Sequence, residues 1–241
     1  MARAAGKVSL ESPTDGMPPS QLAAVEEVRR RILRGELVPG QRLVEAELSE
    51  LLDASRGTVR AALTALAHEG LVERIANIGA RVRVVTLEEA LQISEVRLAV
   101  ESLCVARAAE KITKAEIAEL RAMLKTMKQR VASGDPAGFA ESTHELFNSY
   151  VGIADQPVAE EMLMRLRARN SRHRFRLTFR PGRAAVALPF WVDLIEAICK
   201  RDPVAARAAL ERHVRNVQET MRAIAQEDKP FALDYASKGL D

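Results

Sequence analysis

The sequence predicts a mainly α-helical protein with two domains, a small N-terminal domain that ends in two short strands and a larger all-helical domain. Three observations support this fold class. Aromatic residues make up only 4% of the 241 residues, which is low for a β-sandwich. Apolar residues recur at helical spacing through most of the chain. This spacing changes to alternation over one short stretch, between residues 71 and 85.

Composition narrows the class of protein. Hydrophobic residues make up 47% and charged residues 29% of the chain, so it can bury a core, and global disorder is excluded. The two cysteines, Cys104 and Cys199, are too few for a disulfide framework. No apolar run reaches the roughly 20 residues of a membrane span, and the N-terminus lacks an apolar signal core. We therefore expect a soluble, cytoplasmic protein.

The first domain is expected to span residues 20–85, after a disordered lead at residues 1–19. Its first helix starts at the N-cap Ser20 and stops at Gly35, and a second runs from about Val44 to Leu52. The third helix, residues 56–69, follows after a very short turn that ends at the N-cap Ser55. Two short helices joined so tightly are typical of a helix-turn-helix.

The stretch after the third helix predicts a β-hairpin. Residues 71–75 and 80–85 alternate in polarity, and Asn77-Ile78-Gly79 supplies the residue types of a hairpin tip. Three helices followed by a hairpin form a winged helix. This is the predicted fold of the N-terminal domain.

The second domain is expected to span residues 86–228 as an antiparallel helical bundle, followed by a flexible tail at residues 229–241. Its first helix should run to about Ala109, with Ile93, Val96, Val100 and Leu103 on one side. Gly, Pro and Asp clusters separate the further helices, which are predicted at residues 114–133, 136–152, 156–180, 183–200 and 203–226.

The winged helix carries the cationic residues that DNA binding requires. Residues 54–83 contain five arginines and two glutamates, which equals the +3 net charge of the whole chain. Helix N-termini present free N–H groups to phosphate, and arginine can pair with guanine in the major groove. We expect DNA contacts from the start of the third helix and from the wing: Ser55, Arg56, Thr58, Arg60, Gly79 and Arg81. The alternative is that Arg56 and Arg60 are ordinary solvated charges.

Several motifs resemble the GntR family of bacterial transcription regulators. They are residues 35–43 (GELVPGQRL), 48–52 (LSELL), 54–63 (ASRGTVRAAL) and 69–72 (EGLV), and residues 95–101 (EVRLAVE) resemble its FadR-like subfamily. The resemblance implies a homodimer on a pseudo-palindromic operator, with a C-terminal helical domain that binds a small effector, often a carboxylate. Many relatives have an arginine where this chain has Ala46, so one phosphate or base contact is either missing here or supplied by another residue, for which Arg42 is the candidate.

The resemblance also implies a divalent metal, Zn²⁺ or Ni²⁺, held by one Asp or Asn and three histidines. His144 and His213 match two of these positions, but the other two fall on Ala140 and Trp191. Two histidines alone predict weak binding, so no metal cofactor is expected to be required. The favoured interpretation is that both histidines are buried, and that they hydrogen-bond the effector or each other while Trp191 forms a stacking wall.

A run of arginines precedes Trp191 in the sequence. No Asp or Glu occurs between Met162 and Trp191, and Arg165 and Arg169 share one side of a predicted helix. They could form a solvated face, or they could clamp an effector carboxylate together with Arg97. Arg97 and Glu101 could instead form an internal pair, since they are four residues apart.

The predicted function is a metabolite-responsive DNA-binding regulator, for which we expect repression. One alternative is a DNA-binding dimer with a vestigial effector pocket. Another is a metal-dependent enzyme, although no nucleophile elbow, phosphate-binding loop or Cys-His pair near in sequence is present.

Overall fold

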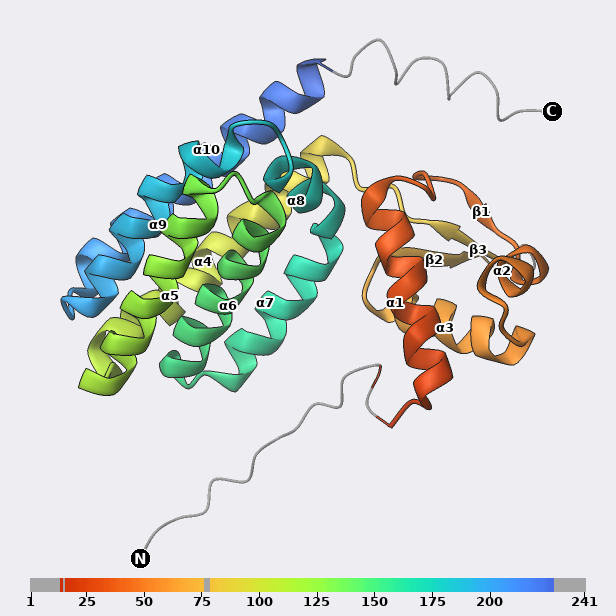
Figure 1. Cartoon of the computed structure of the whole chain (residues 1–241), viewed down its shortest axis with the longest axis horizontal. Coiled ribbons are helices and arrows are strands. Elements are labelled where there is room, and N and C mark those ends of the chain that lie inside the picture. The colour runs from red at the N-terminus through yellow and green to blue at the C-terminus, as the bar shows by residue number, and fades with distance from the viewer. Residues whose placement is uncertain (1–13, 15, 76–78, 228–241) are drawn as a thin grey trace, which may run out of the picture. The chain divides into compact units, whose positions relative to one another are not determined.

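The structure is a computed structural model that describes residues 14, 16–75 and 79–227 (Figure 1). Its contacts divide the chain into two compact units. The first unit runs to Val85 and includes the segment Met164–Arg172, and the second comprises Thr86–Leu163 and the chain from His173. No helix in the described ranges is both long and apolar enough to cross a membrane.

The first unit contains the predicted helix-turn-helix. Its three helices are α1 (Pro19–Arg34), α2 (Glu45–Leu52) and α3 (Arg56–His68). Asp53, at the C-terminus of α2, adopts a left-handed conformation (φ 46°), which turns the chain sharply into α3. The Ser55 hydroxyl accepts a hydrogen bond from the Thr58 N–H (3.1 Å) and thereby caps α3. Val25, Val28, Ile32, Leu63 and Leu66 fill the core between α1 and α3.

A three-stranded antiparallel sheet forms the wing. The strands are β1 (Arg42–Leu43), β2 (Val72–Ile75) and β3 (Gly79–Val82), in the order β1-β3-β2. The hairpin of β2 and β3 confirms the prediction, with shorter strands, whereas β1 was not predicted because two residues cannot show an alternating pattern. Residues 77 and 78 of the predicted tip lie outside the described residues.

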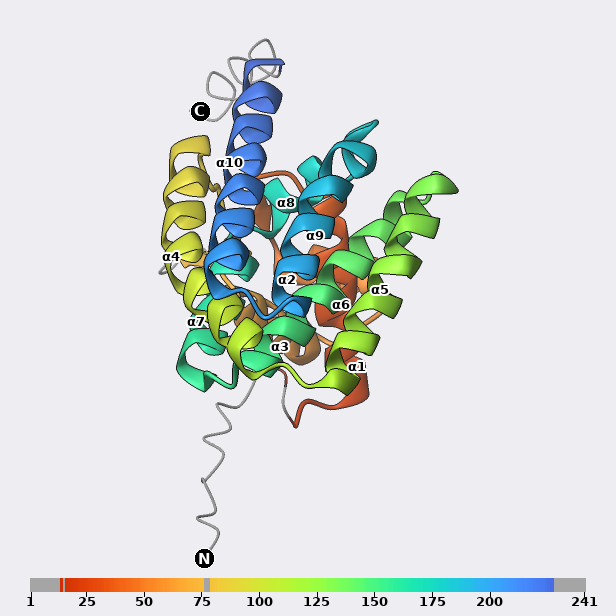
Figure 2. The same ribbon diagram turned by 90° about the vertical axis from the view of Figure 1, so that its left-hand side faces the viewer.

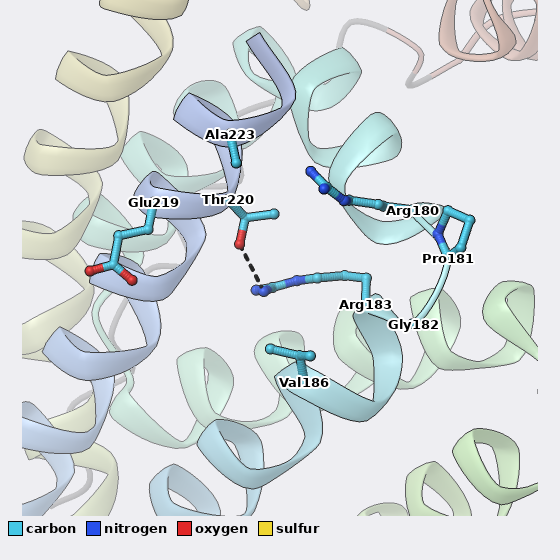
Figure 3. Close-up of a pocket in the computed structure, with 8 residues that line it drawn as sticks. All are labelled: Arg180, Pro181, Gly182, Arg183, Val186, Glu219, Thr220 and Ala223. Atoms are coloured by element: carbon cyan, nitrogen blue, oxygen red, sulfur yellow. Dashed lines mark hydrogen bonds between the residues drawn. The ribbon is translucent and has the colours of Figure 1, made fainter. Parts of the chain in front are cut away.

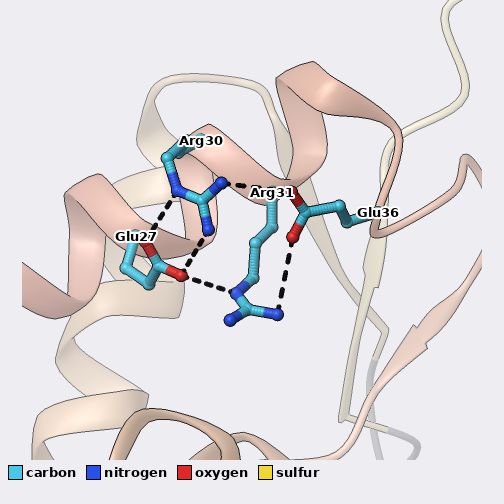
Figure 4. Close-up of polar contacts among 4 residues, drawn as sticks. All are labelled: Glu27, Arg30, Arg31 and Glu36. Atoms are coloured by element: carbon cyan, nitrogen blue, oxygen red, sulfur yellow. Dashed lines mark hydrogen bonds and ion pairs between the residues drawn. The ribbon is translucent and has the colours of Figure 1, made fainter.

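Ion pairs hold the C-terminal end of α1 (Figure 4). Glu27 accepts hydrogen bonds from Arg30 (2.6 and 2.8 Å) and Arg31 (2.7 Å), and Arg30 Nη1 also lies 3.1 Å from Glu36. The two guanidinium groups lower the pKa of Glu27 to about 2. The charges of Arg30 and Arg31 are therefore balanced by Glu27 within α1 and by Glu36 just beyond its end.

The second unit is helical within the described residues: α4, α5, α6, α9 and α10 lie wholly in it, and α7 and α8 lie partly in it. In it, α4 packs against α6, α9 and α10, and α5 packs against α6 and α9 (Figure 2). Leucine, isoleucine and aromatic side chains form the core, among them Leu146, Phe147, Leu194 and Ile195. The bounds are α4 (Leu87–Lys111), α5 (Lys114–Ala132), α6 (Pro136–Ala154), α7 (Pro157–Arg169), α8 (Ser171–Thr178), α9 (Arg183–Cys199) and α10 (Pro203–Glu227).

Two details of the predicted bundle are wrong. The single helix expected over residues 156–180 is two helices, α7 and α8, which are separated at Asn170. Asn170 and Ser171 have short polar side chains that compete with backbone hydrogen bonds, which favours a break there. On α4, Val96 and Leu103 are 49% and 40% exposed, so they lie outside the core rather than beside the buried Ile93.

Candidate DNA-binding surface and buried polar centre

The N-terminal end of α3 presents hydroxyl and guanidinium groups to solvent. The Ser55 and Thr58 hydroxyls lie 3.0 Å apart, and Ser55 and Arg56 are exposed. Within the described residues, the Arg56 guanidinium forms no ion pair or hydrogen bond, and Glu45, whose pKa it helps to lower, is bonded to Arg60 instead. The positive end of the helix and this unpartnered cation therefore lie together on an open surface, which suits an anionic partner.

Arg60 differs from Arg56, since Glu45 of α2 holds it in a bidentate pair. The distances are 2.7 Å from Nη2 to Oε2 and 3.0 Å from Nε to Oε1. The Glu45 carboxylate raises the pKa of Arg60, and Arg60 in turn lowers the pKa of Glu45. The sequence carries no signal for this pair, because its members are 15 residues apart on different helices.

The wing adds a second cationic patch. Arg42 of β1 lies directly opposite Arg81 of β3 in the sheet register, and both are exposed. Two like charges directly opposite each other in a sheet disfavour folding. Glu73 lies opposite Arg81 on the neighbouring strand β2, and its carboxylate offsets this repulsion by pairing with Arg81 Nε at 2.6 Å. Gly79 begins β3 at φ 112°, a conformation that L side chains rarely adopt. The structure thus brings Arg42, Gly79 and Arg81 onto one small sheet.

A buried polar cluster joins α4 to α6 in the helical unit. Arg97 Nε lies 3.0 Å from Glu101 Oε2, and both side chains are less than 10% exposed. The Tyr150 hydroxyl donates a hydrogen bond to Glu101 Oε1 and is fully buried. This confirms the internal-pair interpretation of Arg97 and Glu101. Tyr150 was missed because its contact joins residues 49 apart.

The two histidines lie in different environments. His213 is 7% exposed, and its ring centroid lies 4.9 Å from that of Trp191, which is itself buried. His144 is exposed, and its Nε2 lies 3.1 Å from Asn148 Nδ2, so the expectation that both histidines are buried is wrong. The buried face of α6 instead carries Leu146, Phe147 and Tyr150. In the described part of the chain, no three His, Cys, Asp or Glu side chains gather as a metal site would require.

The other predicted effector residues are Arg165 and Arg169. Both lie in the segment Met164–Arg172, which belongs to the first unit, whereas Arg97 and Glu101 belong to the second. The structure therefore does not bring these arginines and Arg97 together within one unit.

Comparisons with known proteins agree with this architecture. Residues 21–82 match the family described as bacterial regulatory proteins of the gntR family, and residues 92–216 match the FCD domain. The chain is 27% identical over 204 residues to the HTH-type transcriptional repressor RspR of Escherichia coli K12, covering 85% of this chain and 90% of RspR. It is 29% identical over 233 residues to the repressor NanR of Cronobacter sakazakii, covering 85% and 86% of the two chains.

A solved structure supports the same fold. E. coli McbR/YncC superimposes with a TM-score of 0.72 at 22% identity, covering 87% of this chain and all of that one. The matched families and relatives are transcriptional regulators rather than enzymes, so the predicted non-enzymatic role is confirmed. The chain belongs to the GntR family of bacterial transcriptional regulators, with an N-terminal winged helix-turn-helix and a C-terminal FCD domain.

Proposed function

We propose that this regulator binds an operator through the N-terminal end of α3 and the wing, and that a small organic acid bound by the helical unit changes its DNA affinity. The observation that carries the proposal is the exposed, unpartnered Arg56 at the positive end of α3. Ser55, Thr58 and Arg60 extend this surface along α3, and Arg42, Gly79 and Arg81 extend it along the wing.

The proposed contacts fall into two groups. Arg56 and Arg60 read base edges, because a guanidinium can pair with guanine O6 and N7 in the major groove. Ser55, Thr58, Arg42, Arg81 and the backbone at Gly79 contact phosphates, which fix the position of the protein on the duplex. Glu45 keeps Arg60 extended across α2 and α3 before DNA binds, so its guanidinium needs little ordering on binding.

The helical unit is proposed to hold the effector and to form the dimer. Val96 and Leu103 lie seven residues apart on one side of α4 and are exposed, which favours a contact with a second copy of the chain. Trp191 and His213 offer a buried aromatic wall for an effector. Arg97 is not our candidate for the effector carboxylate, because Glu101 already balances its charge.

The remaining features of the proposal concern setting and cofactor. We propose that the protein is a cytoplasmic repressor, in line with the repressors RspR and NanR to which it is similar. It requires no metal, since Ala140 and Trp191 occupy two of the positions where the family resemblance expects ligands.

DNA selection from a randomised duplex library tests this function. The enriched duplex is then titrated, by fluorescence anisotropy, against the wild type and Arg56→Ala. We expect Arg56→Ala to weaken binding about 5- to 150-fold, the value of a lost bidentate base contact. Arg34→Ala, which removes an exposed arginine at the end of α1, is the matched control and should bind as the wild type does. No enrichment of any duplex, or equal affinities for wild type and Arg56→Ala, would contradict the proposal.

A further inference from the structure

The helical unit buries a second arginine, Arg183, which differs from Arg97 in having no carboxylate partner. Arg183 is 4% exposed at the start of α9, and no Asp or Glu in the described ranges forms an ion pair with it. Its Nη1 donates to Asn216 Oδ1 (2.6 Å) and Thr220 Oγ1 (3.0 Å) on α10. Its Nε and Nη2 are buried and have no hydrogen-bond partner. A buried cation with unused donors is costly, so this site calls for an anion.

Arg183 is also one of the residues that line a pocket (Figure 3). The pocket has a volume of about 380 Å³, within the range of small-molecule sites. Pro181, Val186 and Ala223 supply apolar wall, and Arg180 and Arg183 supply donors. The Thr220 hydroxyl already donates to the Asn216 carbonyl and accepts from Arg183. The pocket is therefore shaped for a molecule with an anionic end and an apolar body.

The electrostatics of the pocket favour a single negative charge. Desolvation, assisted by the neighbouring Arg180, lowers the pKa of Arg183 to about 10, so the group is charged at neutral pH. Arg180 is already paired with Glu227 at 2.7 Å. Glu219 also lines the pocket but is exposed, where solvent screens it, and it forms no ion pair within the described chain. No side chain caps the N-terminus of α9, whose positive end adds to the attraction.

We infer that this pocket binds the carboxylate of a small organic acid, with Arg183 Nε–H and Nη2–H as the two donors. These two groups form one edge of the guanidinium, and their parallel N–H bonds match the two oxygens of a carboxylate. Asn216 and Thr220 hold the opposite edge and so fix the direction in which the free edge points. The inference rests on the proposed function only in making this acid the effector, and it places the acid at Arg183 rather than against Trp191 and His213, which do not line this pocket.

Binding is tested on the full-length protein with butyrate, its uncharged analogue butyramide, and inorganic phosphate. The readouts are isothermal titration and the ¹⁵N–¹H signal of Arg183 Nε, which is assigned by its absence from Arg183→Lys. We expect butyrate to bind and to shift this signal, and butyramide to do neither. Binding of phosphate without binding of butyrate would overturn the assignment to a carboxylate.

Val186→Asp tests the site without removing Arg183. Val186 is 53% exposed, lines the pocket and lies one turn after Arg183, so an aspartate there supplies an internal carboxylate. We expect butyrate affinity to fall about tenfold or more, the value of a lost hydrogen bond to a charged group. The matched control is Val204→Asp, in the first turn of α10 and outside the pocket lining, which should bind butyrate as the wild type does.

The outcomes separate this inference from the proposed function. Equal butyrate affinity in wild type and Val186→Asp, or no butyrate binding by the wild type, would overturn the inference, while selected DNA binding would still support the regulator. Butyrate binding that depends on Arg183, in a protein that enriches no DNA, would support the inference and contradict the proposed function.

Discussion

The two units of this regulator each contain an arginine without a carboxylate, in opposite surroundings. Arg56 of the winged helix is exposed, whereas Arg183 of the helical unit is 4% exposed. Water solvates an exposed guanidinium at little cost, so Arg56 is available to a large anionic surface such as DNA. A buried guanidinium has lost that solvation, so Arg183 needs an anion small enough to enter a pocket. The same chemical group therefore indicates a different ligand in each unit.

The comparison extends to the buried arginines within the helical unit. Arg97 has the Glu101 carboxylate at 3.0 Å, and Tyr150 donates to the other oxygen of that carboxylate, so the charge of Arg97 is balanced within the chain even though Arg97 Nε and Glu101 Oε2 form no hydrogen bond. Arg183 has neutral partners on one edge only. Removing each arginine should distinguish a completed pair from an incomplete one.

The largest expected effect is on the free energy of unfolding of Arg97→Met. This change leaves Glu101 buried without its cation and should cost about 3–5 kcal/mol. Arg183→Met removes an unpaired buried charge together with two hydrogen bonds, and should stay within about 1 kcal/mol of the wild type. Urea unfolding followed by circular dichroism measures both, with the exposed Arg212→Met as control. An equal loss in the free energy of unfolding for Arg97→Met and Arg183→Met would contradict the distinction between a paired and an unpaired buried arginine.

A smaller effect is expected from pH. Burial lowers the pKa of Arg183 to about 10, and a carboxylate binds the protonated form. Butyrate affinity should therefore stay constant between pH 6 and 9 and then fall, approaching tenfold per pH unit above about 10. Calorimetric titrations at several pH values follow this, with circular dichroism to confirm that the fold persists. A loss of affinity that is complete below pH 9 would point to a different cation.

The smallest effect concerns Arg60, which differs from Arg56 because Glu45 neutralises it. Glu45→Gln removes this carboxylate, so we expect tighter binding to non-specific DNA and a salt slope that is steeper by about one unit. Stability should change little, because solvent screens the exposed Arg60 guanidinium. Anisotropy titrations over a series of salt concentrations measure the slope. An unchanged slope would show that the Glu45 carboxylate does not oppose the approach of Arg60 to the DNA.

Features that depend on local pattern were predictable from the sequence. The capped start of α3 at Ser55 and the change to alternation after residue 70 indicated the helix-turn-helix and the hairpin, because both signals involve neighbouring residues. The break at Asn170 was missed, since no Gly or Pro marks it. The exposure of Val96 was also missed. When a helix has apolar residues on two sides, their spacing does not reveal which of the two sides is buried.

The contacts of the site residues were likewise predictable only where the two partners are neighbours in the sequence. The pairing of Arg97 with Glu101 was among the sequence interpretations because the two are four residues apart on one helix. The pairing of Arg60 with Glu45 was not among the sequence interpretations. The absence of a carboxylate partner for Arg183 was not among them either. Whether an arginine has a partner depends on the packing of separate helices, as α9 and α10 show at Thr220.

The most direct test of the account measures whether the two unpaired arginines are coupled. The affinity for the selected duplex is determined by anisotropy with and without a saturating organic acid whose binding depends on Arg183, for the wild type and Val186→Asp. We predict a change of about 5- to 150-fold in the wild type, as allosteric coupling usually gives, and none in Val186→Asp. An acid that occupies the Arg183 pocket yet leaves the DNA affinity of the wild type unchanged would contradict the account.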